Sequence, residues 1–243
     1  MIRSALKLLL IKYLNKKHLT IVPFYTNDGK IEKVKYDWLI SQNINMIIDV
    51  GASNGAFASK IRQYFPNTLI YSFEPIPESY RKLVKRFKSD IYFKAFNIAL
   101  GNTSGKLKFN QNAHVGSSSF LEMSTLHKEA HPHTKNYSKI NVRVDKLDNL
   151  INFEDEKLNI FLKLDVQGYE RYVIEGADQL LQKVKVIYTE VSFNELYKGQ
   201  SLINEIIYFL EEKGFKMVGV EDVSRSVIDG TFLQANVFFT RNM

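Results

Sequence analysis

Two acidic residues in the first half of the chain each come at the end of an apolar run and directly before a turn. Asp49 belongs to the run from Ile47 to Val50 and precedes a glycine-rich stretch from Gly51 to Gly55, and Glu74 follows Ser72 and Phe73. The carboxyl ends of parallel strands meet at one edge of a sheet, where ligands bind. We therefore expect both carboxylates at one ligand site, with the glycines letting the backbone approach the ligand closely.

The chemistry of these two acids favours a nucleoside that carries positive charge and no phosphate. A carboxylate at Glu74 accepts both ribose hydroxyls of an adenosine-containing ligand, and one at Asp49 suits a cationic group better than a phosphate. S-adenosylmethionine has an ammonium, a sulfonium and no phosphate. The spacing G-x-x-x-G also departs from the dinucleotide fingerprint G-x-G-x-x-G. A structural strand–helix turn, with Glu74 as a capping acid, is the alternative.

Later acids could supply a catalytic group. Asp165 follows the strand expected over Phe161 to Leu164, and Glu190 lies at the end of the next one. An alcohol acceptor needs its proton removed, so Asp165 is the leading candidate for general base, metal ligand or substrate contact, and Glu190 is a second pocket acid. Capping of the following helix is the structural alternative for Asp165.

Several neighbouring polar residues are further candidates. His114 is an alternative base, because an imidazole titrates near neutral pH. Substrate contacts are expected from Ser117, Ser118, Gln167 and Glu170. Asp165 and Glu190 could together hold a divalent ion, although nothing in their spacing requires one. His131 and His133 are interpreted as solvated loop residues. Lys163 precedes a candidate pocket acid but alternates outward along its strand, so an ordinary packing or surface role stands beside a role at the pocket.

The order of these motifs resembles the FkbM family of S-adenosylmethionine-dependent methyltransferases over roughly residues 45 to 240. Any one motif is weakly specific, but their order and number are specific. The segments that carry the resemblance are Asp-Val-Gly-Ala-x-x-Gly from Asp49, Phe-Glu-Pro-x-Pro from Phe73, Asn97 to Gly101, Ser117 to Ser119, Val144 to Asp148 and Lys163 to Glu170. One departure is Asn236, where relatives often have an aspartate.

This resemblance implies transfer of a methyl group to a hydroxyl oxygen, with sugars of glycolipids or polysaccharides as acceptors. It implies a class I, Rossmann-like α/β fold with helices on both faces of a seven-stranded, mostly parallel sheet whose last strand is antiparallel. The implied cofactor-binding residues are Asp49, Gly51, Ala52, Asn54, Gly55, Glu74, Pro75, Asn97 and Ala99. A nicotinamide-dependent oxidoreductase and, less favoured, an RNA methyltransferase are the alternatives.

The pattern of apolar residues predicts the elements that position these groups. Short apolar runs alternate with amphipathic stretches, which is typical of a parallel sheet covered by helices. Helices are expected over the segments around Phe57 to Tyr64, from Pro77, after Gly168, and after Ser201 as N-cap. The expected strands are Met46 to Val50, Leu69 to Phe73, Ile91 to Ala95, Asn159 to Leu164, Val184 to Val191, Phe215 to Val220 and Leu233 to Thr240.

Composition and charge divide the chain into a basic N-terminal extension, residues 1–44, and one domain, residues 45–243. The net charge is +7, of which residues 1–35 carry +6, so the body is nearly neutral and no specific nucleic acid is expected as a partner. The chain has no cysteine, which excludes disulfides and thiolate chemistry. Within the domain, residues 110–139 lack periodicity and are interpreted as a lid-like insertion.

The segment from Met1 to Lys17 is expected to be helical. Its apolar run from Leu8 to Ile11 is far shorter than the roughly 20 residues that span a bilayer, so neither a signal peptide nor a membrane anchor is expected. Self-association, packing on the domain and peripheral membrane contact are all open for this helix. The expected location is the cytoplasm, with peripheral membrane attachment unresolved.

Overall fold

The computed structural model describes residues 36–151 and 157–241 of the chain. The helix expected over Met1 to Lys17 lies outside these residues. From Leu39 onward the described residues belong to one compact unit, which contains all the candidate site residues. No helix within the described residues is both long and apolar enough to cross a membrane.

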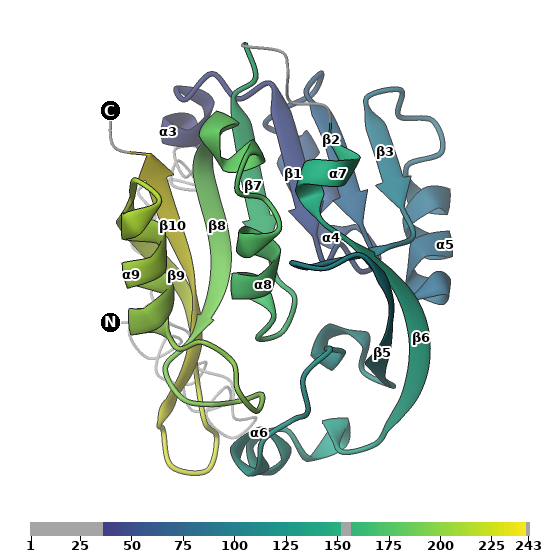
Figure 1. Cartoon of the computed structure of the whole chain (residues 1–243), viewed down its shortest axis with the longest axis vertical. Helices are drawn as coiled ribbons and strands as arrows, with labels where there is room; N and C mark the ends of the chain where they lie inside the picture. The colour runs from purple at the N-terminus through teal and green to yellow at the C-terminus, as the bar shows by residue number, and fades with distance from the viewer. Residues whose placement is uncertain (1–35, 152–156, 242–243) are drawn as a thin grey trace, which may run out of the picture. The chain divides into compact units, whose positions relative to one another are not determined.

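A seven-stranded sheet forms the centre of this unit, in the order β3-β2-β1-β7-β8-β10-β9. The strand β10 pairs antiparallel with both of its neighbours, and the other pairings are parallel (Figure 1). The predicted sheet, with its antiparallel last strand, is confirmed. Its strands are β1 (Met46–Val50), β2 (Leu69–Phe73), β3 (Phe93–Phe96), β7 (Ile160–Leu164), β8 (Val184–Ser192), β9 (Phe215–Arg225) and β10 (Phe232–Arg241).

Helices cover both faces of the sheet, as predicted. On one face, Phe57 of α4 (Ala56–Arg62) lies edge-on to Phe161 of β7, with ring centroids 6.0 Å apart. On the other face, α8 (Glu170–Glu175) buries Val173 and Ile174 in the main apolar cluster. The remaining helices of the unit include α5 (Pro77–Arg86), α7 (Leu147–Leu150) and α9 (Ile203–Glu212), and a 3₁₀ turn, η3, spans Leu180–Lys183. A short helix, α3 (Asp37–Ile40), spans the residues at which the unit begins.

The N-cap predicted for α9 is wrong by one residue. Leu202, not Ser201, occupies the cap position, and its backbone N–H donates to Oε2 of Glu205 at 2.8 Å. The side chain of the third helical residue thus accepts a hydrogen bond from the N–H of the cap residue.

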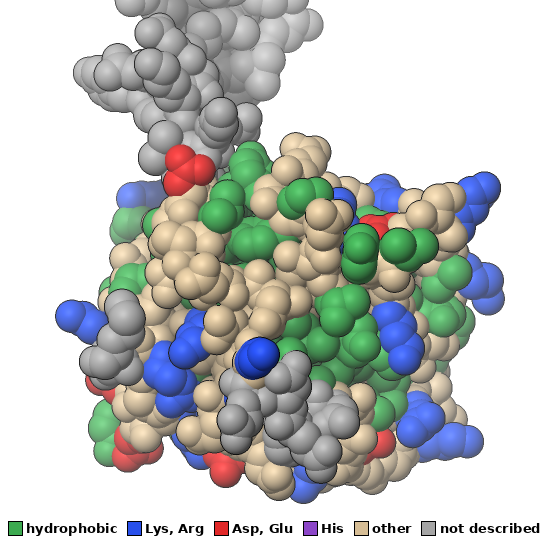
Figure 2. All heavy atoms as spheres, turned by 90° about the horizontal axis from the view of Figure 1, so that it is seen from above, with side chains coloured by type: hydrophobic (Ala, Val, Ile, Leu, Met, Phe, Trp, Pro, Cys, Tyr) green, Lys and Arg blue, Asp and Glu red, His purple; other side chains and the backbone are tan. Residues whose placement is uncertain are grey.

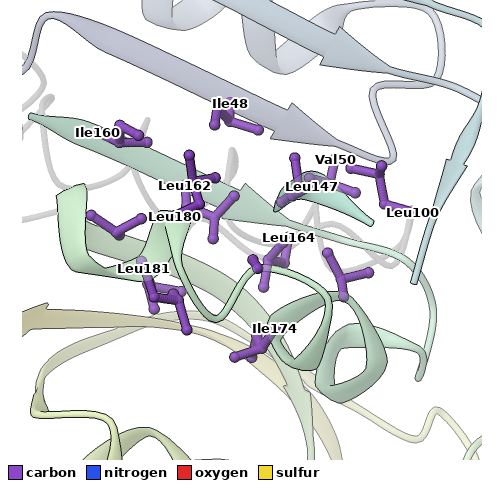
Figure 3. Packing of buried hydrophobic residues seen from close by; sticks show 14 of the residues in the cluster. Ile48, Val50, Leu100, Leu147, Ile160, Leu162, Leu164, Ile174, Leu180 and Leu181 are labelled. Carbon is purple, nitrogen blue, oxygen red and sulfur yellow. The ribbon is translucent and has the colours of Figure 1, made fainter. Parts of the chain in front are cut away.

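The main apolar cluster lies between β1, β7 and α8. Figure 3 shows Ile48, Leu162, Leu164 and Ile174 pointing into one shared layer, and all four are fully buried. A parallel sheet that is covered on both faces needs strands that are apolar throughout, and every residue of β1 and β7 is buried. Asp49 and Lys163 are the charged exceptions in these strands.

The insertion predicted over residues 110–139 is structured, which corrects its interpretation as an aperiodic loop. A second sheet in the order β4-β6-β5 frames it. In Figure 1, β5 and β6 lie below β1, β2 and β3, on the side of the site. The elements concerned are β4 (Ala99–Leu100), β5 (Gly105–Asn112), the 3₁₀ turn η1 (Val115–Ser117), α6 (Thr125–Ala130), the 3₁₀ turn η2 (Pro132–Thr134) and β6 (Tyr137–Asp145).

An apolar cluster packs this insertion against the C-terminal half of the chain. Met123 and Ala130 of the insertion pack with Leu196, Tyr197 and Leu233. The insertion is therefore part of the packed domain.

Candidate functional site

A cavity that is partly open to solvent lies at the carboxyl ends of β1, β2 and β7. Its charged lining consists of two acids, Glu74 and Asp165, and no Lys, Arg or His from the described residues takes part. The remaining lining residues come from the predicted turns and from the insertion: Val50, Gly51, Ser53, Phe73, Pro75, Ile76, Ile98, Ala99, Leu100, Phe109, Gly116, Ser118, Phe120, Val166, Gln167 and Tyr169.

The turn after β1 needs glycine because the protein itself occupies the space of a side chain. Gly51 has φ +75°, and a Cβ atom there would lie 2.0 Å from the backbone oxygen of Asp165. Gly55 has φ +82°, and its Cβ would meet Leu83 and Phe87 of α5. Close packing within the protein thus requires both glycines. Gly51 lines the cavity whereas Gly55 does not, and close approach of a ligand to this turn stays a prediction.

Glu74 links the first two strand ends. Its Oε2 accepts from the N–H of Ser53 and its Oε1 from the N–H of Ile76, each at 2.8 Å. Burial raises its pKa to about 7, although both hydrogen bonds favour the charged form. Asn97 lies outside the cavity lining and donates to the backbone oxygens of Glu74 and Pro75, at 2.8 and 3.0 Å. Asn97 therefore positions Glu74 through the main chain.

Asp49 is fully buried beneath the turn and is paired with Lys163. The parallel register places the two residues side by side, and Lys163 Nζ lies 3.1 Å from Asp49 Oδ1. The same ammonium donates to the backbone oxygens of Val50 and Gly51 and lies 3.6 Å from Oδ2 of Asp165. The surface role considered for Lys163 is thus wrong, since only 6% of this residue is exposed.

The carboxylates around Lys163 set its protonation state. Burial lowers the pKa of Lys163, but the negative charges of Asp49 and Asp165 outweigh this effect and raise it. Asp49 does not line the cavity, so its carboxylate affects the site through its ion pair with Lys163. Its predicted contact with a cofactor stays a prediction.

Asp165 lies at the cavity and belongs to a hydrogen-bonded cluster of side chains. The Nε2 of Gln167 donates to Oδ1 of Asp165 at 2.8 Å and to Oε2 of Glu190 at 3.0 Å. Gln234 also donates to Glu190. Burial, followed by the charge on Asp165, raises the pKa of Glu190 well above its usual range. The structure thus brings together the two acids that the sequence singled out, although only Asp165 lines the cavity.

Other predicted site residues lie outside the cavity lining. Glu170 is buried, accepts from the N–H of Val166 at 2.9 Å, and has a pKa raised by burial to about 7. His114 is exposed and lies 3.5 Å from Ser117, measured from Nδ1 to Oγ.

Ser118 does line the cavity, and its hydroxyl accepts from the N–H of Asn112. Ala52 and Asn54 complete the turn without lining the cavity.

Four histidines gather in the insertion. His127 is 3% exposed, packs edge-on against Tyr197 and has no hydrogen-bond partner on either ring nitrogen among the described residues. Burial, then the neighbouring His131 and His133, lower its pKa to about 4. Across the described ranges, no three His, Asp or Glu side chains are placed to hold a metal ion.

Sequence reasoning missed an aromatic wall of the cavity. The ring of Phe120 lies 5.0 Å from that of Phe109 and 4.8 Å from that of Tyr169, between centroids. Phe109 belongs to β5, a strand the sequence analysis did not propose. The alternation of Phe109 with exposed lysines along β5 was the available signal.

Comparisons with known proteins show which sequences this chain resembles. The sequence pattern of the family described as Methyltransferase FkbM domain matches residues 49–217. The chain is similar to 2-O-methyltransferase NoeI of Sinorhizobium fredii (strain NBRC 101917 / NGR234), with 26% identity over 171 residues, 68% of this chain and 70% of that protein. It is also similar to methyltransferase sdnD of Sordaria araneosa, with 25% identity over 197 residues, 70% of this chain and 73% of that protein.

A solved structure shares the fold. The match to methyltransferase FkbM from Methylobacillus flagellatus KT has a TM-score of 0.50 and 11% identity, and it covers 80% of this chain. The chain spans 44% of the length of that structure.

Replacing Lys163 by methionine should destabilise the fold by roughly 3–5 kcal/mol near pH 8, because it leaves Asp49 buried without its cation. The loss should shrink as the pH falls, since protonation neutralises Asp49. Urea unfolding at several pH values measures this effect. The double variant Asp49→Asn, Lys163→Met should recover much of the stability, and Lys82→Met, at an exposed ion pair, is the control. A Lys163→Met loss no larger than that of the control would contradict the assignment.

Replacing His127 by leucine should make stability less dependent on pH between about 6.5 and 4. The folded pKa of His127 lies below that of the unfolded chain, so the unfolded state binds the extra proton and wild-type stability falls as the pH falls through this window. We expect the variant to gain roughly 1–2 kcal/mol on the wild type between pH 7 and pH 5. Denaturant titrations test this, with the exposed His114→Leu as control. Parallel pH profiles for His127→Leu and wild type would refute the burial argument.

Proposed function

The chain belongs to the FkbM methyltransferase family, and from that membership we propose that it transfers a methyl group from S-adenosylmethionine to a hydroxyl oxygen of a sugar. The observation that carries the proposal is the lining of the cavity, where two acids face the ligand space and no basic side chain of the described residues does. A cationic nucleoside is complementary to such a lining, whereas a pyrophosphate is not.

The residues around the cavity fit this cofactor. Glu74 is buried at the end of β2 with its carboxylate fixed by two backbone N–H groups, which suits it to accept the ribose hydroxyls. The apolar side chains of Ile76 and Ile98 also line the cavity and suit an adenine ring. The turn from Gly51 to Ser53 would hold the methionine half. When bound, S-adenosylmethionine supplies a methyl group on a positively charged sulfur that leaves as a neutral thioether.

Asp165 is the residue we propose as the general base. Methyl transfer from a sulfonium needs chiefly alignment and exclusion of water, but an alcohol must also lose its proton as its oxygen bonds to the methyl carbon. Asp165 reaches the cavity from the end of β7, and its side chain keeps 43% exposure. The proton would pass to an Asp165 carboxylate oxygen, held between Lys163 and Gln167. Ser118 is the polar insertion residue best placed to contact the acceptor.

The proposed acceptor class rests on the name of one relative and not on the lining of the cavity. One relative at 26% identity is named a 2-O-methyltransferase, which supports oxygen as the methylated atom. A carbohydrate or glycolipid acceptor, and a location in the cytoplasm or at a membrane surface, go beyond that name and are part of our proposal.

The alternatives gain no support from the site. A nicotinamide cofactor carries a pyrophosphate, whereas the charged side chains that line the cavity among the described residues are two carboxylates. An RNA substrate favours a continuous basic surface. Figure 2, seen from above the view of Figure 1, shows Lys and Arg side chains spread over that face and separated by apolar and neutral surface.

We expect S-adenosylhomocysteine to bind saturably, with an affinity that weakens as the pH falls from 8 to 6. The pKa of Glu74 is about 7, and the protonated carboxyl group loses acceptor capacity for the ribose hydroxyls, so the loss should reach about tenfold. Isothermal calorimetry measures the Kd. Glu74→Gln should bind at least about tenfold more weakly at pH 8 and lose the pH dependence. Glu78→Gln, exposed on α5, is the matched control. No binding to a folded wild-type chain would overturn the cofactor assignment.

Asp165→Asn should lower methyl transfer by about 10² to 10⁴-fold while the Kd for S-adenosylhomocysteine changes little. The assay follows labelled methyl groups from S-adenosylmethionine into a panel of monosaccharides and their methyl glycosides, with mass spectrometry locating the O-methyl group. Transfer by Asp165→Asn at the wild-type rate would exclude Asp165 as the base. A chain that binds S-adenosylhomocysteine but methylates no sugar would contradict the acceptor class.

A further inference from the structure

The side-chain amide of Gln167 lies between the two acids at the carboxyl ends of β7 and β8. Its Nε2 donates to Asp165 Oδ1 at 2.8 Å and to Glu190 Oε2 at 3.0 Å, which uses both amide hydrogens. Its Oε1 accepts from the hydroxyl of Tyr197 at 2.9 Å. The opposite amide orientation would place the oxygen against two carboxylates, so this network determines the assignment.

The main chain at Gln167 is held in an unusual conformation. Gln167 has φ +56°, in the left-handed region that a residue with a side chain seldom adopts, and Gly168 follows with φ +89°. The carbonyl oxygen of Gln167 accepts from the hydroxyl of Ser119 at 2.7 Å. Strained backbone of this kind persists where the surroundings fix it, often at functional sites. Gln167 therefore connects the end of β7 with β8, with the insertion and with the loop that carries Tyr197.

These hydrogen bonds leave the side-chain amide of Gln167 no free donor for a substrate. The residue lines the cavity, yet both amide hydrogens are directed at carboxylates. The substrate contact predicted for Gln167 stays a prediction, and it would not use these two amide hydrogens. Only one of its two acidic partners, Asp165, lines the cavity.

We infer that Gln167 is a positioning residue that fixes the carboxylate of Asp165 toward the reacting methyl group and keeps it apart from Glu190. This inference rests on the proposed function and deepens it. Two unbridged carboxylates would repel each other, and Asp165 could then leave the orientation that it holds between Lys163 and Gln167. Because Tyr197 and Ser119 hold Gln167 in turn, docking of the insertion also contributes to the orientation of Asp165.

Two ligands that need no acceptor test this inference. S-adenosylhomocysteine has a neutral sulfur, whereas sinefungin carries an amine-bearing carbon in place of the methyl sulfonium and so presents a positive charge where the methyl group would be. Wild type should bind sinefungin about tenfold more tightly than S-adenosylhomocysteine, because a charge-assisted hydrogen bond reaches Asp165. Gln167→Met should reduce this preference to about threefold or less while the Kd for S-adenosylhomocysteine stays within about threefold. Calorimetry on the full chain measures both ligands.

A double-mutant cycle separates positioning from a general structural effect. Asp165→Asn should abolish the sinefungin preference, and adding Gln167→Met to it should change nothing further. Tyr197→Phe, which removes the donor to Gln167 Oε1, should lower the preference partway and is the second test if Gln167→Met lowers Tm. Gln182→Met, exposed on η3, is the matched control.

Four results would overturn the inference. The first two are a wild type that binds sinefungin no more tightly than S-adenosylhomocysteine, and a Gln167→Met variant that keeps the wild-type preference. The third is a Gln167→Met variant that loses the same affinity for both ligands. The fourth is a Gln167→Met substitution that changes the preference equally in the wild type and in the Asp165→Asn variant. A folded wild type that binds neither ligand would instead refute the proposed function.

Discussion

One buried ammonium group connects the parts of the site. Lys163 Nζ contacts the carboxylate of Asp49 at 3.1 Å, the backbone oxygens of Val50 and Gly51, and Asp165 at 3.6 Å. The group therefore holds the turn after β1 against the end of β7, where Gly51 packs on the backbone of Asp165. A buried ion pair contributes little net stability compared with an apolar pair, but removal of one partner costs several kcal/mol. The arrangement is therefore best explained by the geometry that it imposes on the turn and on Asp165.

The acids of the site carry an electrostatic cost that the proposed ligand would relieve. Glu74 and Glu170 both have pKa values raised to about 7, above those of the unfolded chain, so each disfavours the folded state as the pH rises from about 4.5 to 7. Glu170 offsets part of this cost by accepting a hydrogen bond from the N–H of Val166, whereas Glu74 and Asp165 face the cavity. A cation bound between them would lower this cost, and Gln167 already reduces the repulsion between Asp165 and Glu190. The ligand selectivity and the chemistry that we propose for the cavity thus follow from one charge distribution.

Much of this fold could be predicted from sequence because the central strands are apolar runs bounded by turns. Strands β1 and β2 have the predicted bounds, and Glu74 and Asp165 line the cavity as expected from strand ends. The small sheet was missed because β5 exposes Lys106 and Lys108 and so resembles a polar loop. The role of Lys163 was missed because burial of a lysine depends on its register partner, Asp49, which lies more than 100 residues away. The same holds for the hydrogen bonds of Gln167, which join segments distant in sequence.

The most direct measurement is a crystal structure of the chain with S-adenosylhomocysteine bound. The account predicts the ribose hydroxyls on Glu74, the adenine beside Ile98 and the sulfur facing Asp165, with the Lys163 contacts to Asp49 and to the turn preserved. A ligand that lies elsewhere in the chain, or that enters this cavity with its sulfur turned away from Asp165, would contradict it.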